Sequence, residues 1–148
     1  MLNPRVYLCG TITPSPVHLE WRKVAEAALR PFRIDCLSPV RGKDPSDWQK
    51  DGLNSVRDDL PYAGGGFVPR DYRDIDRCDA LLLMFTDTTS RQSIGTWMEA
   101  GYAVARAIPI VVVSQVPTVI GHPFIQRAAA KICPTLEVGV EYLKFLLS

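Results

Sequence analysis

Short apolar runs alternate with helical patterns along the whole chain. The runs predicted as strands are 6–9, 34–37, 80–85, 109–114 and 131–133. Between and after them, apolar residues recur at helical spacing over 18–32, 70–78, 94–107, 123–130 and 137–147. We therefore predict five strands and five helices in a single domain that spans residues 1–148.

Strands that alternate with helices predict a parallel sheet covered on both faces. With right-handed crossovers, the expected fold is α/β, doubly wound and flavodoxin-like, with five strands in the order 2-1-3-4-5. Ligands of such sheets bind beyond the carboxyl ends of the strands, where the strand order reverses. We therefore expect segment 7–13 and loop 86–95 to flank a ligand-binding crevice.

Segment 38–69 is too long for a plain connection. It contains several prolines and glycines and shows little periodicity, apart from a possible helix over about 47–56. Irregular loops beyond about 12–15 residues are usually functional lids or disordered. Because Trp48, Tyr62 and Phe67 argue against disorder, we predict a lid over the crevice.

Composition limits the classes of partner. The chain is 47% hydrophobic and 22% charged, as in an ordinary soluble globular protein. Its net charge is +1 and it has no basic stripe interleaved with aromatic residues, so nucleic acid is not an expected partner. The start has no signal-peptide pattern, and the longest apolar runs are too short to span a membrane. We expect a cytoplasmic protein without a membrane partner.

Cysteine and histidine positions do not suggest a metal site. The four cysteines are widely spaced and form no C-x-x-C pair: Cys9, Cys36, Cys78 and Cys133. We expect them to be reduced thiols. His18 and His122 lack the spacing of metal ligands. We expect neither a metal nor a cofactor.

Helix 94–107 holds one acidic residue, Glu99, in its early turns. One interpretation is a capping box, in which Glu99 and Thr96 bind free backbone groups at the helix start. The other is that Glu99 faces a ligand. Because this helix begins at the predicted crevice, the position of Glu99 favours the ligand-facing interpretation.

Three stretches resemble the nucleoside 2-deoxyribosyltransferase superfamily in order and spacing. They are VYLCGTIT at 6–13, RDYRDIDRCDALL at 70–82 and SIGTWMEAGYAVARAIPIVVV at 93–113. The Gly-Thr-x-x-Glu-x-Gly-Tyr-Ala pattern is the most specific part, and the resemblance extends from residue 6 to about 127. Members of the superfamily cleave the N-glycosidic bond of nucleosides or nucleotides through a glutamate nucleophile, which corresponds to Glu99.

Glycosidic cleavage explains why a carboxylate is needed. Breaking the bond to C1′ passes through an oxocarbenium-like transition state, which a nearby carboxylate can stabilise before it attacks to form a glycosyl ester. The carboxylate must be ionised, and the positive end of a helix N-terminus favours that form.

The resemblance implies roles for two further residues. Asp71 corresponds to an aspartate that contacts the departing base and helps to protonate it, although it could be an exposed helix charge, as we expect of Asp74 and Asp76. Tyr7 corresponds to a tyrosine that hydrogen-bonds the nucleophile, although it could be a buried strand aromatic.

Ser93 departs from the classical transferase pattern, which has a sugar-binding aspartate six residues before the nucleophile. Relatives that hydrolyse nucleoside 5′-monophosphates have a serine there. A serine hydroxyl and free N–H groups at a helix start would hold a phosphate, although Ser93 could be a simple helix cap. That branch often has an arginine where this chain has Thr13, so Arg91 is the candidate for the missing charge.

Further residues are expected to contact substrate. Gly10 and Thr11 follow the first strand, and Gly95 lies at the start of the predicted helix 94–107. Phe67 lies near the end of the predicted lid. His122 lies where the family places a residue that reaches into the site of a neighbouring subunit. This position implies a homodimer or higher homo-oligomer.

The leading hypothesis is hydrolysis of a nucleoside 5′-monophosphate through a glycosyl-Glu99 intermediate. The alternative is a transferase that moves deoxyribose between bases, and the third possibility is a non-catalytic nucleotide-binding module. The base and the choice between ribose and deoxyribose stay open.

Overall fold

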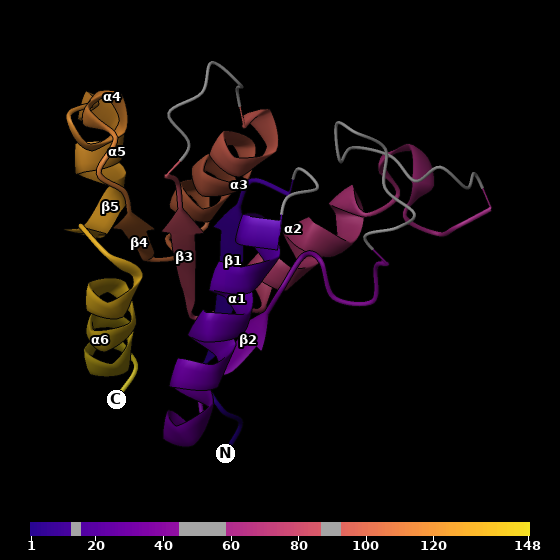
Figure 1. The fold of residues 1–148 in the computed structure, drawn as a ribbon, viewed down its shortest axis with the longest axis horizontal. Helices are drawn as coiled ribbons and strands as arrows, with labels where there is room; N and C mark the ends of the chain where they lie inside the picture. Colours follow the sequence, from indigo (N-terminus) through magenta and orange to yellow (C-terminus); the bar gives the residue numbers. More distant parts are fainter. Residues whose placement is uncertain (13–15, 45–58, 87–92) are drawn as a thin grey trace.

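Five parallel strands form one sheet in the order β2-β1-β3-β4-β5 (Figure 1). The structure is a computed structural model that describes residues 1–12, 16–44, 59–86 and 93–148. Its strands are β1 (Arg5–Gly10), β2 (Asp35–Leu37), β3 (Ala80–Met84), β4 (Ile110–Val113) and β5 (Ala129–Cys133). The predicted five strands and their order are confirmed.

The helices connect successive strands or follow the last one. They are α1 (Pro16–Leu29), α2 (Val68–Asp76), α3 (Ile94–Ala105), α4 (Pro117–Ile120), α5 (Pro123–Ala128) and α6 (Leu136–Leu146), with the 3₁₀ turns η1 (Arg30–Phe32) and η3 (Ala63–Gly65). The five predicted helices are present. The pattern missed α4 because four residues are too few to show a helical period. The helix predicted over 47–56 lies outside the described residues.

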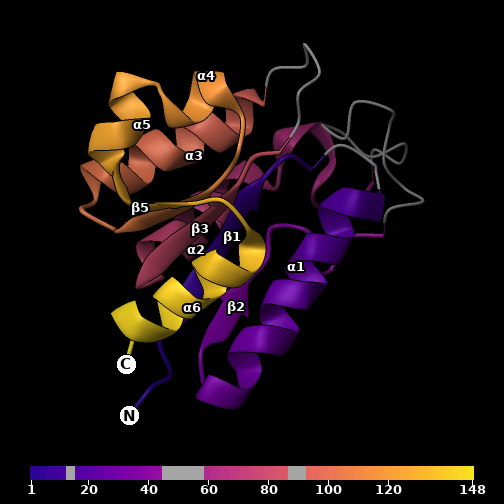
Figure 2. The same ribbon diagram turned by 60° about the vertical axis from the view of Figure 1, so that its left-hand side comes forward.

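Alternate residues of β1 enter two separate cores. Val6 and Leu8 pack with α1 and α6 on one face of the sheet. Tyr7 and Cys9 pack on the other face with the buried residues of α2, α3 and α4. Figure 2 shows α1 and α6 together on one side of the strands. The sheet is therefore covered on both faces, as the alternation of strands and helices predicts.

The strand order reverses between β1 and β3. These strands pair from Val6 with Ala80 to Gly10 with Met84, so their carboxyl ends finish side by side. A Cβ at Gly10 would lie 2.9 Å from the carbonyl oxygen of Met84 and 3.1 Å from the Trp21 ring. Packing alone therefore requires glycine at the end of β1.

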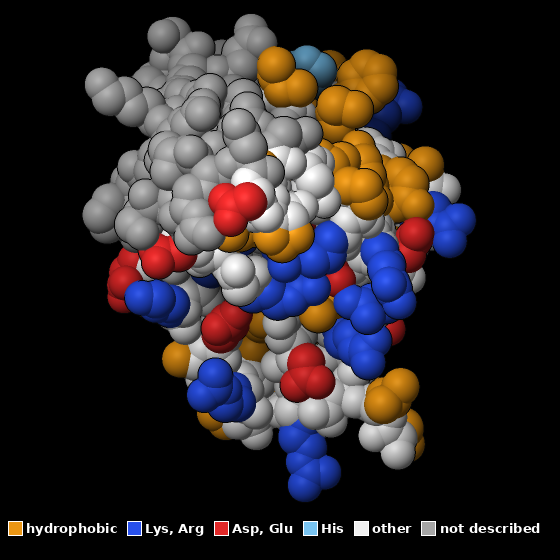
Figure 3. Space-filling view, turned by 90° about the vertical axis from the view of Figure 1, so that its right-hand side faces the viewer, with side chains coloured by type: hydrophobic (Ala, Val, Ile, Leu, Met, Phe, Trp, Pro, Cys, Tyr) orange, Lys and Arg blue, Asp and Glu red, His pale blue; other side chains and the backbone are white. Residues whose placement is uncertain are grey.

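Charged and hydrophobic side chains gather on different parts of one face of the molecule (Figure 3). Figure 3 shows the right-hand side of Figure 1, where Lys and Arg side chains gather in the middle and hydrophobic side chains on the upper right. The four cysteines are free thiols, as expected. Within the ranges that the structure describes, every helix is too short or too polar to cross a membrane.

Candidate active site

Glu99 lies in the second turn of α3, because the helix begins at Ile94 with Ser93 at the N-cap position. The capping-box interpretation is therefore wrong: Thr96 is inside the helix and not at its cap. The Oε2 atom of Glu99 is buried and has no hydrogen-bond partner in the described part of the chain. A buried polar atom without a partner needs an explanation, and a ligand is one.

The Tyr7 hydroxyl and Asp71 Oδ1 are also buried without a hydrogen-bond partner among the described residues. Tyr7 is fully buried on β1, and its hydroxyl has no hydrogen-bond partner among the described residues. Asp71 is buried in the first turn of α2, and its Oδ1 likewise lacks a hydrogen bond, with the Arg70 Nε atom 3.9 Å away. Burial raises the pKa of Tyr7 far above its ordinary value, and the charges of Glu99 and Asp71 raise it further. The structure thus brings Tyr7, Asp71 and Glu99 together.

Both carboxyl groups of the site titrate near neutrality. Burial raises the pKa of Glu99 to about 7, against the opposing effect of the nearby Tyr7 hydroxyl. The two side chains influence each other without the geometry of a hydrogen bond. Burial also raises the pKa of Asp71 to about 6, opposed by the positive charges of Lys43 and Arg70. Burial therefore disfavours negative charge on both carboxyl groups.

A buried arginine supports the end of β1. The guanidinium of Arg22 donates to the carbonyl oxygens of Leu8 at 3.4 Å, Gly10 at 3.0 Å, Thr11 at 3.2 Å and His18 at 2.6 Å. Burial lowers its pKa to about 10, so it stays cationic at neutral pH. Arg22 is not among the residues that the sequence predicted for the site.

One signal could have identified Arg22. It lies on the same helical stripe as the apolar residues Leu19, Ala25 and Leu29, where a charge needs buried partners. In the structure, those partners are backbone carbonyls at the end of β1, just after it and in the first turn of α1. Arg22 is therefore a structural support beneath the site, and its charge also lowers the pKa of Glu99.

Three hydroxyl groups meet at the start of α3. The Thr11 hydroxyl donates to Ser93 Oγ at 3.2 Å, and Ser93 Oγ lies 2.5 Å from the Thr96 hydroxyl. The Ser93 side chain makes no capping hydrogen bond to the helix backbone, so the simple-cap interpretation does not describe it. Gly95 is exposed, with open space where a side chain would stand. Arg91 lies outside the described residues.

Lys43 lies beside the site and was also missed. Its Nζ atom is 4.1 Å from the Phe67 ring centroid and 6.0 Å from that of Tyr62. Burial lowers the pKa of Lys43 to about 8, opposed by the negative charge of Asp71. Phe67 itself is half-buried at the N-cap position of α2. No local pattern distinguishes Lys43 from an ordinary exposed loop lysine.

The expected exposure of Asp74 is wrong, whereas Asp76 is indeed exposed. Asp74 is fully buried and forms ion pairs of 2.5 Å with both Arg41 and Arg77. Burial alone would raise the pKa of Asp74, but the two guanidinium groups outweigh it and lower the pKa. Helical spacing did not reveal this, because the ion-pair partner Arg41 comes from a distant loop.

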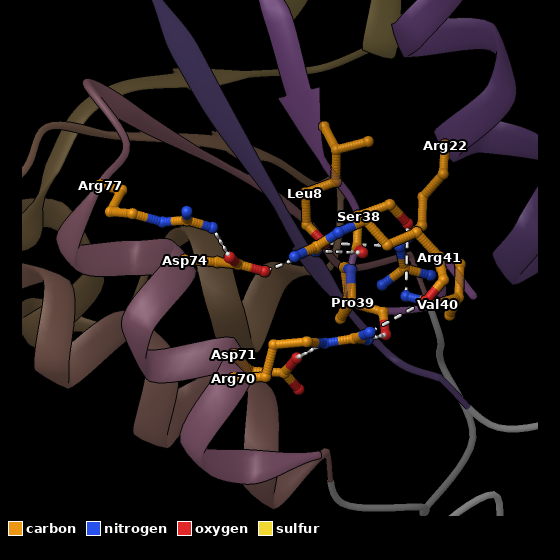
Figure 4. Close-up of polar contacts among 10 residues, drawn as sticks. All are labelled: Leu8, Arg22, Ser38, Pro39, Val40, Arg41, Arg70, Asp71, Asp74 and Arg77. Carbon is orange, nitrogen blue, oxygen red and sulfur yellow. Dashed lines mark hydrogen bonds and ion pairs between the residues drawn. The ribbon is translucent and has the colours of Figure 1, made fainter. Parts of the chain in front are cut away.

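The same contacts fix the chain after β2 onto α2 (Figure 4). Arg70 donates to the carbonyl oxygens of Arg41 at 3.1 Å and Pro39 at 2.7 Å. Arg41 in turn donates to the Ser38 carbonyl at 2.9 Å and pairs with Asp74. We call these five residues, Ser38, Pro39, Arg41, Arg70 and Asp74, the clamp.

His122 does not join this group within one chain. It is exposed at the N-cap of α5, where its Nδ1 accepts a hydrogen bond from the Phe124 amide at 3.3 Å. In the parts that the structure describes, no hydrogen bond or ring contact links it to Tyr7, Asp71 or Glu99. Those parts also contain no cluster of His, Cys, Asp and Glu that could hold a metal ion.

Comparison with known proteins identifies a family for the chain. The family model described as nucleoside 2-deoxyribosyltransferase matches residues 6–129. A 2-deoxyribosyltransferase from Bacillus psychrosaccharolyticus is 16% identical, with TM-score 0.66 over 90% of this chain and 88% of that one. The CMP N-glycosidase BcmB from Clostridium botulinum is 14% identical, with TM-score 0.56 over 97% and 99%.

A conserved protein from Enterococcus faecalis V583 is 15% identical, with TM-score 0.69 over 97% of this chain and 98% of that one. At these identities, the structural likenesses show a shared fold. No curated protein sequence matches the chain.

Proposed function

The chain belongs to the nucleoside 2-deoxyribosyltransferase family of glycosyl-transferring enzymes, and on this premise we propose that it hydrolyses the N-glycosidic bond of a nucleoside 5′-monophosphate. One observation carries the proposal. Tyr7 lies close enough to Asp71 and Glu99 for their charges to raise its pKa. Within the described residues, Tyr7 Oη, Asp71 Oδ1 and Glu99 Oε2 are buried and have no hydrogen-bond partner. Such a group of polar atoms fits a reacting substrate.

Glu99 acts as the nucleophile. Its ionised carboxylate attacks C1′ while the C1′–N bond breaks, and the bonding electrons leave with the base. Asp71 in its protonated form supplies the proton that the departing base takes up. Water then cleaves the glycosyl ester, which releases the sugar phosphate and restores Glu99.

Tyr7 positions the nucleophile in this scheme. Its buried hydroxyl lies close enough to lower the pKa of Glu99, although no hydrogen bond joins the two side chains. Catalytic hydrogen bonds are often long in empty sites and shorten when substrate binds. A hydrogen bond from Tyr7 would favour the ionised form of Glu99 before the attack.

The hydroxyl groups of Thr11, Ser93 and Thr96 support a 5′-phosphate as part of the substrate. They gather at the start of α3, where backbone N–H groups and the helix dipole favour an anion. A carboxylate at position 93 would repel a phosphate. This arrangement favours the monophosphate over the nucleoside.

Deoxyribosyl transfer between bases is the second candidate. It uses the same covalent intermediate and differs only in whether a base or water accepts the sugar. The likeness to the transferase from Bacillus psychrosaccharolyticus supports it at the level of the fold.

The deciding experiment offers the protein nucleosides and 5′-monophosphates, with and without a second free base, and separates the products by chromatography. Free base from monophosphates in both conditions supports the hydrolase. New nucleoside that forms only with an acceptor base supports the transferase. If no substrate reacts, the result would support a non-catalytic nucleotide-binding module.

We also propose that the chain forms a homodimer through an apolar surface of α3 and α5. Ile94 and Met98, one turn apart on α3, are 64% and 59% exposed, and Phe124 on α5 is 81% exposed. Large exposed apolar side chains of this kind mark interaction surfaces. His122, next to this surface, could then reach the site of the partner. Sedimentation equilibrium would test the dimer, and a monomer at all concentrations would contradict it.

A further inference from the structure

Lys43 carries a positive charge that the described structure leaves without a polar partner. Its contacts are the ring faces of Phe67 and Tyr62, and in the described part of the chain its ammonium makes no hydrogen bond or ion pair. A half-buried ammonium normally finds an acceptor, because losing water without one is costly. The free donors of Lys43 are therefore available to a ligand.

The clamp fixes the place of this ammonium. Arg70 holds the carbonyl oxygens of Pro39 and Arg41, so the chain reaches Lys43 directly from an anchored stretch. Asp71 follows Arg70 on α2, and the charges of Lys43 and Asp71 act strongly on each other. Lys43 is thus placed on the Asp71 side of the site.

The charges around Lys43 come from three helices. Asp71 and Arg70 belong to α2, Glu99 to α3 and Arg22 to α1. In the proposed reaction, a base leaves toward Asp71 with the electrons of the broken bond. As Asp71 gives up its proton it becomes negatively charged next to the departing base, which disfavours the transfer. A cation beside Asp71 offsets this effect.

We propose that Lys43 binds the leaving base: it donates a hydrogen bond to an acceptor on the edge of the base, such as O2 of a pyrimidine or N7 of a purine. It also stabilises the negative charge that the base gains as the C1′–N bond breaks. The ammonium keeps its protons, and Asp71 remains the proton donor. This inference rests on the proposed function and adds the group that recognises the base.

The ionisation of the site agrees with this role. Glu99 must be ionised and has a pKa of about 7, whereas protonated Asp71, with a pKa of about 6, is already scarce at that pH. Lys43, with a pKa of about 8, is still protonated just above pH 7, where Glu99 is ionised and protonated Asp71 is scarce. We therefore expect the basic limb of the pH–rate profile to depend on Lys43.

The test compares Lys43→Met with Lys43→Arg and with Lys23→Met, a control at an exposed lysine of α1. Each variant is assayed with natural 5′-monophosphates and with analogues whose base carries electron-withdrawing substituents. Lys43→Met should lower kcat about 100-fold for natural bases and less than about 10-fold for electron-poor bases, which leave with little help. Its basic limb should move to higher pH, because Lys43 no longer lowers the pKa of Asp71, the proton donor. Lys43→Arg should retain most activity, and Lys23→Met all of it.

A binding measurement separates this inference from the proposed reaction. Calorimetry of adenine and 7-deazaadenine should show weaker adenine binding in Lys43→Met, with the difference between the two bases reduced. Equal kcat losses for natural and electron-poor bases, or adenine binding equal to that of the parent, would overturn the role of Lys43. A parent protein that binds adenine through Lys43 but cleaves no substrate would refute the proposed reaction alone.

Discussion

The two sides of the site are held in place by different kinds of structure. On the nucleophile side, Tyr7 is part of a central strand and Glu99 part of a helix packed on the sheet. On the leaving-base side, Asp71 belongs to α2, but Lys43 depends on a loop that the ion pairs and hydrogen bonds of the clamp fix to that helix. Regular packing supports one carboxyl group, and polar contacts organise the surroundings of the other.

The two sides of the site should therefore tolerate substitutions differently. Strand β1 and helix α3 are built by the hydrophobic core, so the position of Glu99 relative to Tyr7 survives any change that the core survives. The neighbourhood of Asp71 depends on a few charged contacts, each of which one substitution can remove. Variants on the leaving-base side should therefore change the reaction without unfolding the protein, and they can separate binding of the base from attack on the sugar.

The largest expected effect is at the nucleophile. Glu99→Gln should lower kcat at least about 10⁴-fold, because the side chain keeps its size but cannot form the glycosyl ester. Rapid-mixing or steady-state assays of base release would measure this loss. Glu20→Gln, at an exposed position of α1, is the matched control and should retain full activity. Near-normal turnover by Glu99→Gln would remove Glu99 from the mechanism.

On the leaving-base side, Asp71→Asn should lower kcat about 10²–10⁴-fold for natural bases, because the amide cannot donate the required proton. Bases that leave without protonation should be affected much less. The comparison of kcat across bases of different leaving ability is the measurement. A loss of the same size for every base would count against proton donation by Asp71.

A smaller effect is expected when the clamp is broken. Arg70→Met removes the hydrogen bonds to Pro39 and Arg41, so Lys43 should lose its fixed place and kcat should fall about 10–100-fold. Arg73→Met, an exposed arginine on the same helix, serves as the control. Circular dichroism should show both variants folded. If Arg70→Met turned over natural bases as fast as the control, the clamp would have no positioning role.

The proposed phosphate site belongs to the nucleophile side and should respond differently. Ser93→Asp places a negative charge against the 5′-phosphate, so KM for the monophosphate should rise about 10-fold or more. The corresponding nucleoside carries no phosphate and should show little change. Equal effects on both substrates would indicate that Ser93 only supports the start of α3.

The smallest effect concerns the pH dependence of stability. Burial raises the pKa of Glu99 from 4.5 to about 7, so the folded protein holds this proton more tightly than the unfolded chain does. Ionised Glu99 therefore destabilises the fold increasingly as pH rises from about 4.5 to about 7. Glu99→Gln should be more stable than the parent by about 1–3 kcal/mol at pH 8 and by almost nothing at pH 4. Thermal unfolding at both pH values would test this, and a constant difference would contradict it.

Much of the nucleophile side could be predicted from the sequence. The alternation of strands and helices predicted the strand order, and from that order we expected the start of α3 beside the end of β1, where the Thr11–Ser93 hydrogen bond joins them. Tyr7, Asp71 and Glu99 are indeed brought together, and the hydroxyl groups of Thr11 and Ser93 meet beside them. Periodicity and the geometry of parallel sheets predicted which segments meet, whereas the family resemblance singled out Tyr7 and Asp71.

The rest depends on contacts between distant segments. Asp74 looked like an exposed helix charge, since its ion-pair partner Arg41 lies in a loop that no period describes. Lys43 lies near Asp71 only because the clamp holds that loop against α2. Arg22 could have been recognised from its apolar stripe, but the four carbonyl groups that it binds could not. Long-range polar contacts leave no local pattern in a single sequence.

Strand β1 has a further consequence for how chains of this kind can diverge. Val6 and Leu8 belong to one core, whereas Tyr7 belongs to the other and also faces the site, so only one face of the strand contributes to the chemistry. Substitution of Val6 or Leu8 should affect mainly folding, and substitution of Tyr7 should affect both folding and the reaction. Inserting or deleting a single residue before Gly10 would exchange the faces and send the tyrosine into the opposite core. We therefore expect length changes among relatives to be absent from β1 and to collect in the connections around it.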